Sequence, residues 1–292
     1  MTQHPKPNFN TILIVPVGAQ AFGCALVQDA KFLDHIRSYV TAFYYPLPVE
    51  VFDTPLSLKG VSRRSNEHDK PQYLISEIFS LINKKTLRNS KVYLRLGILF
   101  DDIYPGDEWN FVYGQAIPSE RVGVFSFARH SSFFNDGLTV KDVDLDSLDN
   151  KEVIFWLKHS MHTAVHEIGH LFNIKHCIYY QCFINGSNGA GEHAGKSSFE
   201  CPVCLRKVLY VLSIGSSSRV EVVTRYERLI AALESINGSF GVSGGAIGMD
   251  VTWLRRRISF ILGDDAEPKE EGAETLSEQL LCLEVAEEKG EV

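Results

Sequence analysis

Two histidines and a glutamate lie within one short run, His166-Glu167-Ile168-Gly169-His170. Residues four apart share a face of a helix, so both imidazoles can reach one ion, and Glu167 lies beside them, close enough to a metal-bound water to take its proton. Three neutral protein ligands with one open position define a catalytic zinc, which lowers the pKa of its water and polarises a carbonyl. The run therefore predicts a hydrolytic zinc site on a helix.

A third ligand follows at His176, six residues after His170. This is the separation of the HExxHxxGxxH motif, in which the helix ends after the second histidine and the chain turns sharply to bring back a third. Asn173 occupies the glycine position of that motif. Among non-glycine residues, asparagine best tolerates a positive φ, so we expect the turn to form at some cost in strain.

Four cysteines begin directly after the third histidine, at Cys177, Cys182, Cys201 and Cys204. Four thiolates that end in a CxxC pair predict a closed tetrahedral zinc site with a structural role. The region between them is rich in Gly, Ser and Asn and offers little apolar material, so metal ligation would supply its ordering free energy. Free or disulfide-bonded cysteines are the alternative.

Other histidines and cysteines receive plainer interpretations. His159 and His162 lie on the same predicted helix, but a helix presents only two consecutive turns to one ion, so His162 is expected to be a polar neighbour of the site. Cys24 and Cys282 are expected to be ordinary thiols.

The first half of the chain alternates apolar runs with segments of helical spacing. Strands are expected at residues 11–17, 49–54 and 92–100, with helices at 29–44 and 73–83 between them. This β-α-β-α-β order favours a largely parallel sheet with right-handed crossovers.

The second half is expected to be mainly helical. A run at residues 121–128 predicts one more strand, at the edge of the sheet, and Asp149 and Asn150 offer caps for a long helix that carries the histidines. Further helices are expected at 202–212, 220–236 and 251–262.

Composition excludes several classes of protein. Hydrophobic residues make up 45% and charged residues 22%, as in a chain with a buried core. Residues 264–292 have eleven acidic residues against two lysines, a net charge of −9, whereas the whole chain has a net charge of −7. The rest of the chain is therefore nearly neutral, and nucleic-acid binding is not expected. No apolar run predicts a membrane span or a secretory signal, so we expect an intracellular protein, cytoplasmic although a nuclear location stays open.

The string from His166 to Cys204 resembles the archaemetzincin family, zinc metallopeptidases that pair a catalytic zinc with a nearby four-cysteine zinc. Similar segments are seen at residues 109–116, 122–129 and 225–226, so the resemblance extends over about 12–262. One departure is Ile184, where the family has the methionine of the Met-turn, an apolar floor beneath the zinc. Isoleucine fills a similar volume but is stiffer, so we expect altered stability more than loss of metal.

The resemblance implies the fold and the domains. It implies an α/β metzincin-like domain with a mixed, mostly parallel sheet, an antiparallel edge strand that lines an extended substrate, a long active-site helix and a mainly helical C-terminal part. The catalytic domain would span residues 1–263, with an upper part at about 11–173 and a lower part at about 174–263 that holds the four-cysteine zinc. Residues 264–292 would form an acidic tail.

The predicted function is hydrolysis of peptide bonds by a monomer that carries two zinc ions. His166, His170 and His176 would bind the catalytic zinc, Glu167 would be the general base, and the four cysteines would bind the structural zinc. Peptides or proteins would be the substrates. Two alternatives stay open: a catalytically weak or inactive, zinc-stabilised binding protein, and an amide hydrolase acting on other substrates. Tyr179 and His193 are chemical candidates for stabilising the oxyanion.

Overall fold

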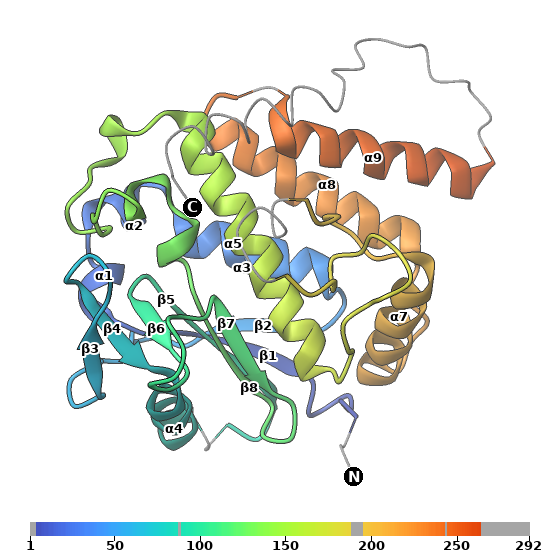
Figure 1. The fold of residues 1–292 in the computed structure, drawn as a ribbon. Coiled ribbons are helices and arrows are strands. Elements are labelled where there is room, and N and C mark those ends of the chain that lie inside the picture. The colour runs from blue at the N-terminus through green and yellow to red at the C-terminus, as the bar shows by residue number, and fades with distance from the viewer. Residues whose placement is uncertain (1–3, 87–88, 188–194, 243, 264–292) are drawn as a thin grey trace.

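The computed structural model describes residues 4–86, 89–187, 195–242 and 244–263. A five-stranded sheet in the order β2-β1-β5-β8-β7 forms its centre, flanked by helices on both faces (Figure 1). The strands are β1 (Thr11–Pro16), β2 (Val49–Val51), β5 (Val92–Leu99), β8 (Val122–Ser126) and β7 (Gly114–Ile117). β7 alone runs antiparallel, against β8, so the expected mixed, mostly parallel sheet is confirmed.

One detail of the predicted sheet is wrong. The run at residues 121–128 forms β8, which lies inside the sheet between β5 and β7, and the edge strand is the preceding β7. Every residue of β8 is buried, as expected for a strand covered on both faces. Among the described strands, the short β7 pairs only with β8, and its side chains are mostly half-buried. Its sequence therefore shows no clear alternation of buried and exposed residues.

A second, smaller sheet was not expected. Its three strands are β3 (Arg63–Ser65), β4 (Pro71–Leu74) and β6 (Asp102–Tyr104), in the order β3-β4-β6. The predicted helix at 73–83 accordingly begins later, as α4 (Ile75–Thr86), because Tyr73 and Leu74 pair with β6.

α4 covers one face of the main sheet, and the helices on the opposite face contribute most of the buried core. The chain between β1 and β2 forms α1 (Ala19–Phe22), α2 (Ala25–Asp29) and α3 (Phe32–Phe43). α3 packs against α5 (Asn150–Leu171) and α8 (Val222–Ser239), and α8 packs against α9 (Gly245–Leu262). Short 3-10 turns at Ala128–His130, Ser132–Phe134 and Leu145–Ser147 connect β8 to α5, and α7 (Pro202–Ser216) follows the cysteine region.

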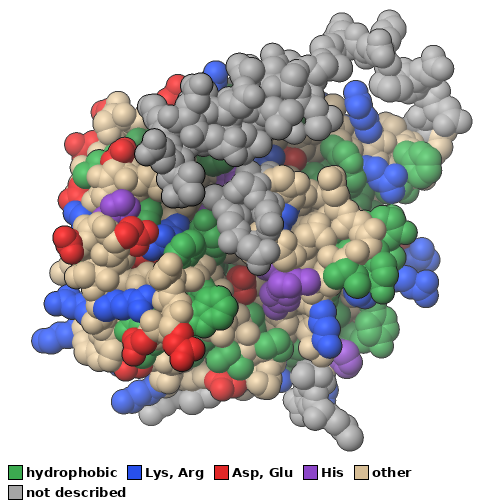
Figure 2. Space-filling model, viewed as in Figure 1, with side chains coloured by type: hydrophobic (Ala, Val, Ile, Leu, Met, Phe, Trp, Pro, Cys, Tyr) green, Lys and Arg blue, Asp and Glu red, His purple; other side chains and the backbone are tan. Residues whose placement is uncertain are grey.

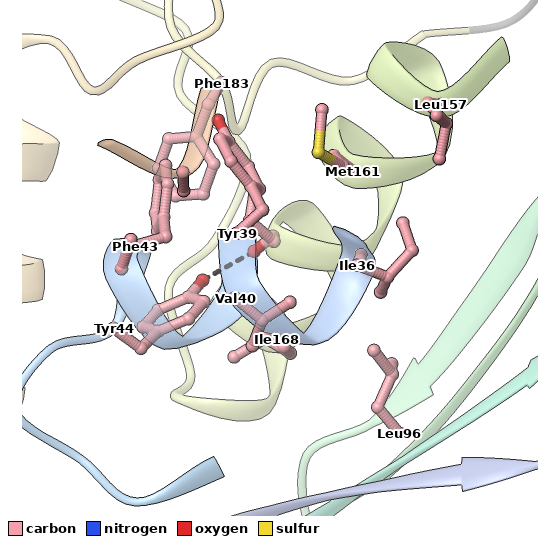
Figure 3. Packing of buried hydrophobic residues seen from close by; sticks show 14 of the residues in the cluster. Ile36, Tyr39, Val40, Phe43, Tyr44, Leu96, Leu157, Met161, Ile168 and Phe183 are labelled. Carbon is pink, nitrogen blue, oxygen red and sulfur yellow. Dashed lines mark hydrogen bonds between the residues drawn. The ribbon is translucent and has the colours of Figure 1, made fainter. Parts of the chain in front are cut away.

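The packing of α3 on α5 fixes the helix that carries the histidines (Figure 3). Ile36 and Val40 of α3 face Met161 and Ile168 of α5, and all four side chains are fully buried. The hydroxyl of Tyr44 donates to the backbone carbonyl of Val165, one residue before the first histidine. This hydrogen bond and the apolar packing together hold the part of α5 that carries the histidines.

The N-terminus of α5 is closed by the predicted cap. The Asp149 side chain accepts from the Lys151 N–H at 2.8 Å, and the Glu152 side chain accepts from the Asp149 N–H at 3.1 Å. This reciprocal capping box satisfies N–H groups that the helix itself leaves without partners. Residues 264–292, the expected acidic tail, lie outside the described residues. In the described part of the chain, none of the helices combines the length and apolar character that crossing a membrane requires.

Candidate metal centre

The carboxyl-terminal half of α5 brings the predicted histidines together. One ring nitrogen from each of His166, His170 and His176 lies within 4.8 Å of the others. His166 is buried, His170 is partly exposed and His176 is exposed, so the cluster opens to solvent on one side. Figure 2 shows histidine side chains gathered near the middle of this face of the molecule, with hydrophobic side chains on both sides.

Hydrogen bonds fix which nitrogen of each helical histidine is available. The Nδ1 atom of His166 lies 3.0 Å from the Phe183 carbonyl oxygen, and that of His170 lies 2.8 Å from the Ile174 carbonyl oxygen. A carbonyl only accepts, so both Nδ1 atoms carry the proton and both Nε2 atoms keep a lone pair. Those Nε2 atoms lie 3.0 Å apart. Two facing lone pairs at this separation repel each other unless a cation lies between them, so the donor set fits a zinc ion.

The chain turns sharply after α5, as expected for the return of the third histidine. Asn173 has φ 66°. The Asn173 N–H donates to the His170 carbonyl at 2.7 Å, and the Ile174 N–H donates to the Gly169 carbonyl at 3.0 Å. This pair of bonds is the Schellman arrangement, which needs a left-handed residue at the position of Asn173. Asparagine thus forms the turn that the motif assigns to glycine.

Ile184, which occupies the Met-turn position of the family pattern, packs against α5. It is fully buried, and its Cδ1 atom lies 2.7 Å from where a Cβ atom on Gly169 would be. Phe183 lies 3.4 Å from the same position. Glycine at 169 therefore lets the floor approach α5 between the two helical histidines.

Glu167 is buried beside the cluster. Burial raises the pKa of its carboxyl group to about 8, and the nearby charge of Lys196 opposes that rise. The same burial lowers the pKa of the three histidines, and the charge of Lys196 adds to this effect. Neutral imidazoles are the form that binds a metal, and a divalent cation beside Glu167 would favour its carboxylate.

The four predicted cysteines form a second cluster. Their Sγ atoms all lie within 4.8 Å of one another, and all four residues are buried. Backbone N–H groups donate to two of the sulfurs, Cys201 N–H to Cys182 and Cys204 N–H to Cys201, each at 3.4 Å. Such bonds favour thiolates, and Cys201 also caps the start of α7 with Pro202 as its first residue. Four converging sulfurs in a closed pocket suit a tetrahedral zinc.

Comparison with known proteins decides the family. The model of Peptidase family M54 matches residues 91–209, which include both clusters. Archaemetzincin-2 of Rattus norvegicus is 30% identical over 256 residues, which are 82% of this chain and 68% of that protein. Archaemetzincin-2 of Homo sapiens is 32% identical over 241 residues, 77% of this chain and 64% of that protein.

The chain belongs to the archaemetzincin family.

The archaemetzincin fold is also found among solved structures. The crystal structure of archaemetzincin from Methanopyrus kandleri superposes with a TM-score of 0.50 and 21% identity, covering 72% of this chain and 98% of that one. The expected α/β architecture is therefore confirmed. The chain spans just under two thirds of the length of the first curated archaemetzincins it matches.

Asn185 organises this archaemetzincin's cysteine loop and was not predicted from sequence. Its Oδ1 atom accepts from the Cys182 N–H at 2.6 Å, and its Nδ2 group donates to the carbonyls of Cys177 at 2.7 Å and Tyr180 at 2.9 Å. One amide thus spans the loop between the first two cysteines. Asn and Gly are common in any loop, so no spacing distinguished this asparagine.

A buried ion pair holds the second half of the cysteine cluster. Arg225 donates to both carboxylate oxygens of Glu200 and, at 2.6 Å, to the carbonyl of Phe43, and both charged side chains are fully buried. It joins the residue before Cys201 to α8 and to the end of α3. Residues 225–226 belong to the segments similar to the family, but nothing in the sequence pattern indicates Glu200 as the partner of Arg225.

Other candidates lie apart from the histidine cluster. The metal-ligand group found among the described residues does not include His159 or His162, as expected. The Thr163 hydroxyl oxygen on α5 lies 3.0 Å from the His130 Nε2 atom. Tyr179 is 75% exposed, and His193 lies outside the described residues. Lys196, whose charge acts on all three histidines, was not singled out from sequence.

Proposed function

We propose that this archaemetzincin is a zinc-dependent peptidase whose catalytic zinc is held by His166, His170 and His176. The convergence of the three histidine nitrogens within 4.8 Å, beside the buried Glu167, carries the proposal. The described geometry leaves one side of the cluster open, where a substrate carbonyl and a water can enter. A zinc ion bound there would polarise the carbonyl and make the water more acidic.

Glu167 is the group that moves the proton. It follows His166 directly and is only 8% exposed, so its carboxyl group is largely screened from bulk water. In the proposed reaction it takes a proton from the attacking water and delivers it to the nitrogen of the leaving amine. The carbonyls of Phe183 and Ile174 orient the imidazoles meanwhile.

The edge strand β7 suits an extended peptide. It pairs with β8 on one side and ends the five-stranded order on the other, and it packs close to α5. Among the described strands none pairs with its outer edge, where a substrate strand would add main-chain hydrogen bonds without demanding a particular side chain. Peptides or proteins are therefore the proposed substrates.

The four cysteines are proposed to hold a second, structural zinc. All four are buried, and their sulfurs surround a common centre. A closed set of four thiolates has no position for water and contributes to folding. We thus expect two zinc ions per chain, with different functions.

A conservative variant tests the assignment of Glu167. Glu167→Gln keeps the side-chain shape but cannot accept the proton, so cleavage of a mixed peptide library, followed by mass spectrometry, should fall by a factor of about 10²–10⁴. Zinc content by elemental analysis should stay at the wild-type value. Glu227→Gln, an equivalent change at an exposed position of α8, serves as the control and should cleave like the wild type.

Each other outcome points elsewhere. Two zinc ions without cleavage by the wild type would favour the zinc-stabilised binding protein. Equal cleavage by wild type and Glu167→Gln would show that another group moves the proton. One zinc or none would contradict the ligand assignment.

A further inference from the structure

A cavity separate from the histidine cluster lies at the carboxyl ends of β1 and β5. It has a volume of about 550 Å³. Residues that follow β1 (Gly18–Gln20) and the residue Asp101, which follows β5, form one wall. The loop at 57–61 and the small sheet form the other wall, and α1, β3 and β4 lie together at the left of the molecule, whereas α5 ends near its middle (Figure 1).

The topology of the sheet singles out this position. From β1 the chain crosses by α3 to β2 on one side, and from β2 it returns by α4 to β5 on the other side of β1. The apolar residues of α3 and α4 belong to separate core clusters on opposite faces of the sheet. The chain leaves β1 toward β2 on one side and leaves β5 toward β7 and β8 on the other, which opens a crevice between β1 and β5. In open α/β sheets, ligands bind at such switch points.

Positive charge dominates the lining. Lys59, Arg63 and Lys141 line the cavity together with a single carboxylate, that of Asp101, whereas the whole chain carries a net charge of −7. The Lys141 Nζ atom lies 3.8 Å from an Asp101 oxygen, but the described residues provide no ion-pair partner for Lys59 or Arg63. The neighbouring Glu77 is engaged by the Ser62 N–H and hydroxyl, each at 2.7 Å. Concave walls with an excess of one charge attract ligands of the other sign.

The Asp101 carboxyl group packs closely against the backbone at Gly18, just after β1. Its Oδ2 atom lies 2.7 Å from where a Cβ atom on Gly18 would be, and Gly18 has φ 91°, so only glycine fits there. The Asp101 side chain is 15% exposed, and its carbonyl accepts from the Ser126 hydroxyl. An acceptor fixed at the bottom of a basic cavity suits a ligand that carries both an anion and hydroxyl groups.

We propose that this cavity binds a small phosphate ester of a sugar, with the phosphate on Lys59, Arg63 and Lys141 and sugar hydroxyls donating to Asp101. Leu58, Val61 and the ring of Tyr73 supply apolar surface for the rest of the molecule. The volume suits a ligand of this size. A sugar phosphate and a nucleotide share the required chemistry, and the site is independent of the zinc centre.

Calorimetric titration of the full, zinc-loaded chain at one fixed salt concentration tests the proposal. The probes are ribose 5-phosphate, adenosine monophosphate, inorganic phosphate and ribose. Ribose 5-phosphate is expected to bind more tightly than phosphate, and ribose is expected not to bind. If adenosine monophosphate binds more tightly than ribose 5-phosphate, the cavity is a nucleotide site. If it binds equally or more weakly than ribose 5-phosphate, while both esters bind more tightly than phosphate, the cavity is a sugar-phosphate site. No binding of either ester at millimolar concentration, or equal binding of phosphate and both esters, would overturn the proposal.

Two variants separate the phosphate contacts from the hydroxyl contact. Lys59→Gln with Arg63→Gln should weaken ribose 5-phosphate by about tenfold or more, because charge-assisted bonds to phosphate are lost. Asp101→Asn should weaken ribose 5-phosphate while leaving inorganic phosphate equal or tighter. Lys84→Gln with Lys85→Gln, the same change of charge on exposed positions of α4, should have little effect. An equal loss in that control, or an equal gain for both ligands in Asp101→Asn, would contradict the assigned contacts.

Discussion

The histidine cluster ends at His176 and the cysteine cluster begins at the next residue, Cys177, yet the two clusters differ in exposure. Exposure rises from His166 to His170 to His176, whereas all four cysteines are buried. A site that opens to solvent can exchange a water or substrate, and a closed site cannot. The same stretch of chain thus provides one centre suited to chemistry and another suited to holding the chain together.

Phe183 connects the two centres. Its carbonyl accepts from the His166 ring, and its N–H donates to the Phe199 carbonyl, two residues before Cys201, at 2.9 Å. Disorder in the cysteine loop would therefore release a bond that orients a histidine. Loss of the cysteine site should disturb the histidine site more than the reverse.

The largest effect is expected from Cys204→Ser. It removes one ligand of the proposed structural zinc, so we expect a loss of stability of several kcal/mol, together with loss of activity. Thermal unfolding and zinc content measure both. Cys24→Ser, at a half-buried cysteine outside the cluster, should keep wild-type values. Wild-type stability in Cys204→Ser would show that the cysteines have no structural metal.

A smaller effect is expected from Glu200→Gln, which tests the ion pair behind the cysteine cluster. Arg225 would keep its charge in a fully buried position without a counter-ion, at a cost of about 3–5 kcal/mol in the free energy of unfolding. Denaturant unfolding gives the value. Glu234→Gln is the matched control, because its ion pair with Arg255 is exposed and should contribute less than about 1 kcal/mol. Equal losses in the two variants would contradict the importance of burial.

Gly169→Ala addresses the floor of the histidine site. The new Cβ would lie 2.7 Å from Ile184 Cδ1, so we expect a cost of about 1–3 kcal/mol. Ile184→Val removes that Cδ1 atom, and the double variant should recover much of the loss. Gly248→Ala on α9, where the Cβ meets nothing within 4 Å, should instead stabilise by up to about 1 kcal/mol. Additive losses in the double variant would show that the contact is not the cause.

The sequence predicted the parts of the molecule that are encoded locally. His166 and His170 lie four apart on one helix, the cap of α5 lies within four residues, and the long strands are mostly apolar. Each of these patterns involves residues that are close together in the sequence, so spacing and residue type alone identify it. Motif spacing likewise indicated the third histidine with its turn and the four-cysteine site, and the archaemetzincin resemblance added the expected fold and domains.

Contacts between distant residues were not predicted. The Arg225–Glu200 pair is 25 residues apart, and the His166–Phe183 bond is 17 apart. Such contacts depend on how elements pack, and neither residue type nor spacing marks them. The small sheet was missed for a related reason, since β3 and β6 have three residues each and are too short for a period to show.

Substitutions of Asn173 are expected to give the smallest changes in stability, and they test whether its turn is strained. Its φ of 66° costs asparagine little, so Asn173→Gly should change stability by less than about 1 kcal/mol, whereas Asn173→Ala should lose about 1–2 kcal/mol. Ser217, in the same conformation at the end of α7, provides the comparison. Serine tolerates a left-handed backbone less well than asparagine, so Ser217→Gly should stabilise more than Asn173→Gly. A larger gain from glycine at 173 would mean that the turn bringing His176 back is strained in this chain, and peptide cleavage by Asn173→Gly would then show whether that strain limits the proposed activity.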